Sequence, residues 1–222
     1  TLAVPEIETE IRKNIVYPET FDRIASLIPG AGRWTDLTRA EPVSKVYSMG
    51  NLKSLWRSYA KDGAPEVLNF FAIGDAAVRT NPLYGRGCSA SVTHAHALAE
   101  ILNATHDPAA RALAFDARTR LELRAHWSSM VKQDAAAIRR AKKELTEDAI
   151  GPATRGDIAG FRALMRPFHM LEHPAVWLKR PGILARILWM WMKPRAWKQH
   201  LAAPVLGPAR AAMLEKLGLR AT

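Results

Sequence analysis

Apolar residues recur at intervals of three and four positions in three stretches of the chain, and this spacing predicts α-helices. The first stretch runs from Pro18 to Ile28. The second follows Gly87, and its apolar face is formed by Val92, Ala95, Leu98 and Leu102. The third begins at Asp107-Pro108, since Asp favours the N-cap and Pro the first turn, and extends to about Leu145.

Two patterns of the strand type lie between these predicted helices. Leu68 to Ile73 is a short apolar run, which predicts a buried strand. In the segment from Val43 to Met49, one side would carry Val43, Lys45 and Tyr47, and the other Ser44, Val46 and Ser48, which predicts a strand. We expect it to pair with Leu52–Tyr59 through a turn at Gly50-Asn51. The predicted fold class is therefore α+β and mostly α.

A group of glycines and one acid follows the predicted buried strand. Gly74-Asp75 ends it, and Asn81-Pro82-Leu83-Tyr84-Gly85-Arg86-Gly87 leads into the next helix. A carboxylate at the end of a strand accepts hydrogen bonds from sugar-like hydroxyls. The first N–H groups of a helix lack partners within it and favour negative charge. This arrangement suits a ligand with hydroxyls at one end and negative charge at the other.

Residues 68–102 resemble the second flavin-binding motif of FAD-dependent monooxygenases of the aromatic-hydroxylase type. The shared pattern is an apolar strand, Gly-Asp-Ala, then Pro-x-x-Gly-x-Gly and a helix. The resemblance implies that Asp75 binds a ribityl hydroxyl of FAD and that the helix start faces the isoalloxazine edge. The cofactor contacts that it implies are Gly74, Asp75, Ala76, Pro82, Gly85, Arg86, Gly87, Cys88 and Ser89, with no catalytic residue identified.

The motif departs from its relatives at three positions. Arg86 stands where many have Gln, and it would pair with an anionic flavin or substrate or point to solvent. Cys88-Ser89 replaces Met-Asn or Met-Thr. The backbone donors remain, while Cys88 itself is expected to be a small packed residue rather than a nucleophile.

The resemblance implies an oxidoreductase that uses FAD, takes electrons from NAD(P)H and oxygenates a small apolar organic substrate. Reduction of isoprenoid-like substrates is an alternative. The Gly-x-Gly-x-x-Gly unit that binds the FAD pyrophosphate in this family is missing, because Gly30-Ala31-Gly32 lacks the third glycine and a preceding strand. We therefore infer a C-terminal portion that needs an N-terminal FAD-binding portion and binds FAD weakly or not at all by itself.

The resemblance also suggests four segments. Residues 1–67 would be a remnant of the substrate-domain sheet and its helices, and 68–105 the flavin motif. Residues 106–150 would form the long helix, and 151–222 a basic, Trp-rich helical tail. Substrate-pocket candidates in the first segment are Trp34, Tyr47, Trp56 and Arg57, each of which ordinary packing or surface exposure would also explain.

Composition adds a charge asymmetry. Residues 151–222 hold twelve Lys or Arg and three Asp or Glu, so they carry +9 of the chain's +11. Basic residues beside Trp and Leu are typical of segments lying on anionic lipid, so residues 177–200 are candidates for peripheral membrane contact. A substrate lid, a dimer interface and a non-enzymatic binding module with a vestigial flavin motif are alternatives. Nucleic acid is not expected, because the cations alternate with large apolar residues.

Cysteine and histidine usage excludes several kinds of site. The single cysteine rules out an internal disulfide and fits a reducing, cytoplasmic compartment. His94 and His96 point to different faces of the predicted helix, so we interpret them as structural or solvent-facing rather than as metal ligands. Ile183–Met192 is apolar, but about ten residues are too few to span a bilayer.

Overall fold

The computed structural model describes residues 1–142, 154, 157–194 and 207–219 of the chain, and it divides into two compact units. One unit combines residues 1–51 with 203–222, and the other spans residues 52–202. Helices predominate and the strands are two residues long, so the prediction of a mostly helical α+β chain is confirmed. These two units differ from the four consecutive segments that the sequence suggests. The helix near the C-terminus belongs to the same unit as the helices near the N-terminus.

The smaller unit is a cluster of short helices. They are α1 (Thr9–Asn14), α2 (Pro18–Leu27), the 3-10 turn η1 (Gly32–Trp34) and α9 (Arg210–Leu217). Pro18 occupies the first turn of α2, as the sequence predicts. The core of this unit joins both ends of the chain through Ile11, Ile24, Leu214 and Leu217.

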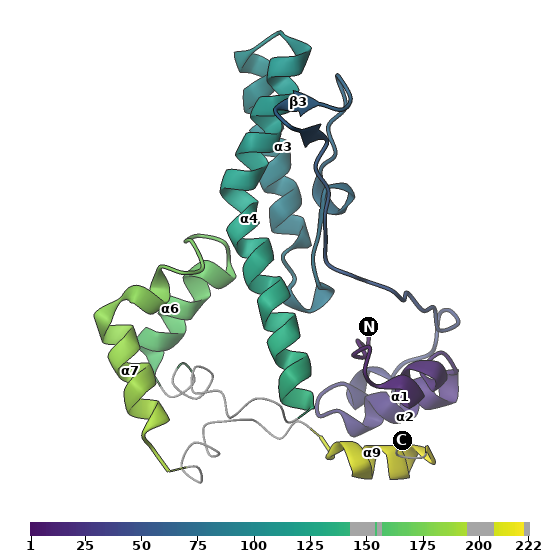
Figure 1. Cartoon of the computed structure of the whole chain (residues 1–222). Helices are drawn as coiled ribbons and strands as arrows, with labels where there is room; N and C mark the ends of the chain where they lie inside the picture. The colour runs from purple at the N-terminus through teal and green to yellow at the C-terminus, as the bar shows by residue number, and fades with distance from the viewer. Residues whose placement is uncertain (143–153, 155–156, 195–206, 220–222) are drawn as a thin grey trace. The chain divides into compact units, whose positions relative to one another are not determined.

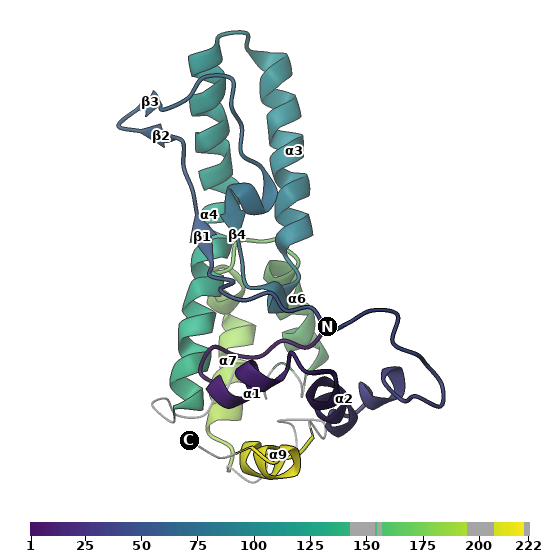
Figure 2. The same ribbon diagram turned by 90° about the vertical axis from the view of Figure 1, so that its right-hand side faces the viewer.

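The larger unit is built around two long helices that lie side by side (Figures 1 and 2). They are α3 (Gly87–Ala104) and α4 (Pro108–Ala141), joined by a short connection. The Asp107 carboxylate accepts a hydrogen bond from the Ala110 N–H at 2.6 Å, which confirms the predicted start of α4. The predicted end near Leu145 lies outside the described residues.

The buried face of α3 is not the predicted one. The helix buries Ala90, His94 and Ala97, whereas Val92 is 69% exposed and Leu102 is also exposed. The prediction of a helix is confirmed, but the prediction of its apolar face as the buried face is wrong. The small residues Ala90 and Ala97 on the buried side let α3 approach its neighbours closely. Helix α4 buries a continuous stripe with spacings of three and four: Phe115, Thr119, Leu123, His126 and Met130.

Two predicted strands do not form. The segment 43–49 has no strand, and Val43 and Tyr47 are 94% and 74% exposed, so its alternation produces no buried face. The segment 68–73 is extended at Ile73 (φ −123°, ψ 160°), but it pairs with no strand among the described residues. A strand needs a neighbouring ladder of hydrogen bonds, and local sequence cannot supply one.

The strands that do form are two antiparallel pairs. Leu55–Trp56 (β1) pairs with Val78–Arg79 (β4), and Ala60–Lys61 (β2) pairs with Ala64–Pro65 (β3). The predicted strand at Leu52–Tyr59 is thus shorter than expected and has a different partner. Its real partner directly follows the Gly-Asp turn, so β1 helps to position that turn.

The rest of the larger unit contains α6 (Ile158–Phe168), the 3-10 turn η4 (Trp177–Lys179) and α7 (Pro181–Trp191). The Asp157 carboxylate caps α6 by accepting from the Gly160 N–H at 2.6 Å. Trp177 is buried with Ala163 and Ile183. Within the described ranges, no helix is both long and apolar enough to cross a membrane.

Candidate functional site

The Gly-Asp dipeptide forms a tight turn that packs directly on α3. Residues Gly74–Ala76 make the 3-10 turn η2, and Gly74 has a left-handed φ of +57°. Its buried N–H donates to Nδ1 of His94 at 3.0 Å. A Cβ added to Gly74 would lie 2.5 Å from Oγ of Ser91, so the approach to α3 requires glycine.

The Asp75 carboxylate lies at the N-terminus of α3. A Cβ added to Gly87 would come 3.4 Å from Oδ1 of Asp75, which places the carboxylate against the first residue of the helix. Asp75 and Ala76 are exposed, so the oxygens can accept from a ligand. The two halves of the motif, the acid and the helix start, therefore come together as the sequence predicts.

The loop before α3 is held from the far end of α4. Asn81 caps the 3-10 turn η3 (Pro82–Tyr84) by accepting from the Leu83 N–H at 3.0 Å. Its side-chain amide and the Tyr84 hydroxyl both donate to Oδ1 of Asp134, at 2.8 and 3.1 Å. Burial and the Asp134 charge raise the pKa of Tyr84 to about 12, so its hydroxyl stays a donor. Asp134 thus fixes the loop.

The first turn of α3 remains open. Gly85 is left-handed with φ +62°, and within the described part of the chain the N-cap residue Arg86 makes no side-chain cap at the helix start. Pro82, Gly85, Cys88 and Ser89 are exposed, and the N–H groups of the first turn have no acceptor within the helix. The thiol of Cys88 is therefore not packed, which corrects that expectation. An exposed row of backbone donors next to an exposed carboxylate is the main chemical feature of the site.

Arg86 lies inside the protein rather than in the open site. It is 6% exposed, its Nε donates to the Phe168 carbonyl at 2.9 Å, and its guanidinium lies over the rings of Tyr84 and Phe168. Burial lowers its pKa from the usual value. Of the two alternatives for Arg86, orientation toward solvent is wrong and pairing with an anionic ligand stays a prediction. In this structure the guanidinium fixes the loop to the end of α6.

Arg57, the residue after β1, supports the Gly-Asp turn. Its Nη1 donates to the carbonyls of Asp75 at 3.3 Å and Ala76 at 3.0 Å. Of the four substrate-pocket candidates, Trp56 and Arg57 belong to this unit. Trp34 and Tyr47 belong to the other unit and are 82% and 74% exposed.

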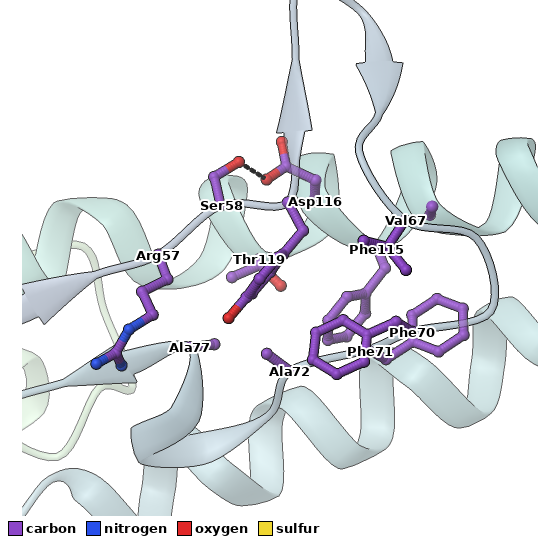
Figure 3. Close-up of a pocket in the computed structure, with 12 residues that line it drawn as sticks. Arg57, Ser58, Val67, Phe70, Phe71, Ala72, Ala77, Phe115, Asp116 and Thr119 are labelled. Atoms are coloured by element: carbon purple, nitrogen blue, oxygen red, sulfur yellow. Dashed lines mark hydrogen bonds between the residues drawn. The ribbon is translucent and has the colours of Figure 1, made fainter.

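A small open hollow adjoins the turn through Ala72 and Ala77 (Figure 3). Phe71 packs edge-on against Phe115 at 5.6 Å, and at the opposite end Ser58 donates to Oδ1 of Asp116 at 2.7 Å. Thr119 also lines the hollow, and its buried hydroxyl has no hydrogen-bond partner among the residues that the structure describes. The walls of the hollow are therefore apolar, with a few polar groups.

The sequence did not predict that three residues would contact the motif: Ser91, His94 and Asp134. Each side chain contacts the motif from a helix, at separations of 17 to 53 positions in the chain. The one local signal is spacing, because His94 lies four residues after Ala90 and three before Ala97, on the face that α3 buries.

Acid is expected to destabilise the protein below about pH 6.5 through His94. Burial lowers its pKa below the usual 6.5, although Glu122 opposes the shift. As pH falls, the unfolded chain therefore takes up the proton first. This contribution to stability is complete above pH 6.5 and declines toward the folded-state pKa. The measurement is the free energy of unfolding in urea at several values between pH 5 and 8.

Two variants distinguish His94 from other sources of acid sensitivity. His94→Asn should flatten the profile below pH 6.5, and His96→Asn, which removes an exposed imidazole of the same helix, is the matched comparison. His126 contributes a second term of the same sign, because burial, Arg86 and His173 lower its pKa. An unchanged slope in His94→Asn would show that the buried imidazole is not responsible.

No group of three or more potential metal ligands occurs among the residues that the structure describes. Comparisons of the chain with family models, with curated proteins and with solved structures find no match. Any functional conclusion therefore depends on the residues of the site.

Proposed function

We propose that the chain is part of an FAD-dependent oxidoreductase and that η2 with the start of α3 binds one half of the cofactor. The main support is the contact between Asp75 and the first residue of α3, which puts an exposed carboxylate beside exposed backbone donors. The carboxylate would accept from a ribityl hydroxyl. The N–H groups of Gly87, Cys88 and Ser89 would face the electron-rich edge of the isoalloxazine.

The geometry fits this assignment in two further respects. Gly74 and Gly87 both lie where an added Cβ would meet a neighbour, so the turn and the helix can approach each other closely. The Asp134 hydrogen bonds hold the loop through the side chains of Asn81 and Tyr84 rather than through the first N–H groups of α3. Arg86 is the exception, because its side chain faces away and would act on the cofactor only by fixing the loop.

The reaction we propose is oxygenation of a small apolar organic substrate with NAD(P)H as electron donor, with reduction of an isoprenoid-like substrate as the second candidate. Bound FAD would supply the redox chemistry, while the chain's own residues would hold and orient it. The FAD pyrophosphate would be bound by an N-terminal portion of the same protein. The single cysteine supports a cytoplasmic location.

Asp75→Ala is expected to weaken FAD binding at least about tenfold, because hydrogen bonds to a charged group contribute about 1.5–3 kcal/mol. The measurement is FAD titration of the complete gene product, followed by flavin fluorescence and absorbance. Asp75→Asn keeps one acceptor oxygen and should lose less.

Glu66→Ala is the matched control, since Glu66 is an exposed carboxylate in the preceding segment. It should bind FAD like the unaltered protein. Equal FAD affinity and an identical spectrum in Asp75→Ala would refute the assignment of this turn to the cofactor.

A further inference from the structure

Helix α7 is apolar on both its inner and its outer side. On the inner side Ile183 and Met190 are buried, and Ile183 packs with Trp177 and Ala163. Ile187 packs against the same cluster. This stripe, with spacings of four and three, packs α7 against α6 and η4, which lie beside it in Figure 1.

The outer side of α7 is a large exposed apolar surface. Leu184, Leu188 and Trp191 follow one another at spacings of four and three, so they form one stripe along the helix. Their exposed fractions are 47%, 50% and 64%, and Trp189 and Met192 beside them are also mostly exposed. Contiguous apolar patches of this kind are uncommon unless they contact a membrane or a partner.

The surroundings of this outer face are positively charged. Residues 157–194 contain six Lys or Arg and two acids, which gives a net charge of +4. Both acids are already engaged, because Glu172 pairs with Arg166 and Arg180 at 2.8 Å and Asp157 pairs with Arg186. The ammonium of Lys193 lies 4.3 Å from the ring centre of Trp189, at the C-terminal end of the helix. The outer face thus combines Trp, Leu and Met with Lys193 at its C-terminal end, within a segment of net positive charge.

We propose that the outer face of α7 docks on an anionic lipid bilayer, with the helix lying in the plane of the interface. Tryptophan favours the headgroup region, where one side of the ring meets acyl chains and the other meets water. Lys and Arg at the rim would be attracted by anionic headgroups. An eleven-residue helix is too short to span, so contact is limited to one leaflet. This docking is independent of the flavin site.

The test is flotation of the protein with vesicles of phosphatidylcholine, with and without phosphatidylglycerol. The protein should float with the anionic vesicles, float less with the neutral ones, and release as salt is raised. Leu188→Glu should lower the partition coefficient about tenfold or more, because a leucine that the lipid interface would bury is replaced by a charge.

Leu121→Glu is the matched control, since Leu121 is a 78% exposed leucine on α4, away from this face. It should float like the unaltered protein, and both variants should show unchanged helix content by circular dichroism. Binding that Leu188→Glu leaves intact, or no binding to either vesicle, would overturn the proposal. So would a dimer in sedimentation velocity that Leu188→Glu dissociates without any vesicle binding, because α7 would then be a protein interface.

Discussion

Replacing His94 with Ala is expected to lower the free energy of unfolding by about 3 kcal/mol. The imidazole is 1% exposed and its Nδ1 accepts the buried Gly74 N–H at 3.0 Å. Its loss leaves that N–H without a partner, which costs about 1–3 kcal/mol, and leaves a cavity as well. Chemical denaturation monitored by circular dichroism measures the effect.

Two further variants separate the hydrogen bond from the packing. In His94→Asn the side-chain oxygen can take the position of Nδ1, so part of the loss should be recovered. His94→Phe keeps the ring volume but not the acceptor, so it should remain destabilised. If Ala and Asn proved equally destabilising, the hydrogen bond to the Gly-Asp turn would contribute nothing measurable.

Gly74→Ala is expected to cost about 2 kcal/mol. A left-handed φ of +57° penalises any Cβ by about 1–2 kcal/mol, and the new Cβ would also lie 2.5 Å from Oγ of Ser91. The same denaturation experiment measures the loss. Because the turn would have to move away from α3, the FAD binding proposed above should fall in parallel with stability.

Gly85→Ala is the natural comparison for this prediction. Gly85 has a similar φ of +62°, but a Cβ there would meet nothing within 4 Å. It should therefore show the dihedral cost alone, and the difference between the two variants should report the contact with Ser91. Adding Ser91→Ala to Gly74→Ala should recover that difference, and failure to recover it would place the strain elsewhere.

Features set by neighbouring residues could be predicted from the sequence. Asp107 and Pro108 determine the start of α4 by their own chemistry, and the structure has that start. Asp75 and Gly87 are twelve positions apart on either side of a loop, so the turn and the helix start come together although the predicted strand before them does not form. In both cases the local backbone has few alternatives.

Features that depend on distant partners could not be predicted. The segment 43–49 alternates like a strand, yet no neighbour supplies its hydrogen bonds. On helix α3, His94 is buried and accepts a hydrogen bond from the Gly74 N–H, twenty positions away in the chain. Val92, on another side of the helix, is exposed. The apolar periodicity of α3 alone favours burial of the face with Val92, because it contains no information about the buried N–H of a turn earlier in the chain.

The exposed thiol of Cys88 allows selective chemical labelling of the protein. It is the only thiol in the sequence and it is exposed in the first turn of α3. A maleimide or a spin label would therefore modify the molecule at one position, two residues past the buried Arg86. Without any engineered cysteine, a spectroscopic reporter can be attached directly where the helix begins.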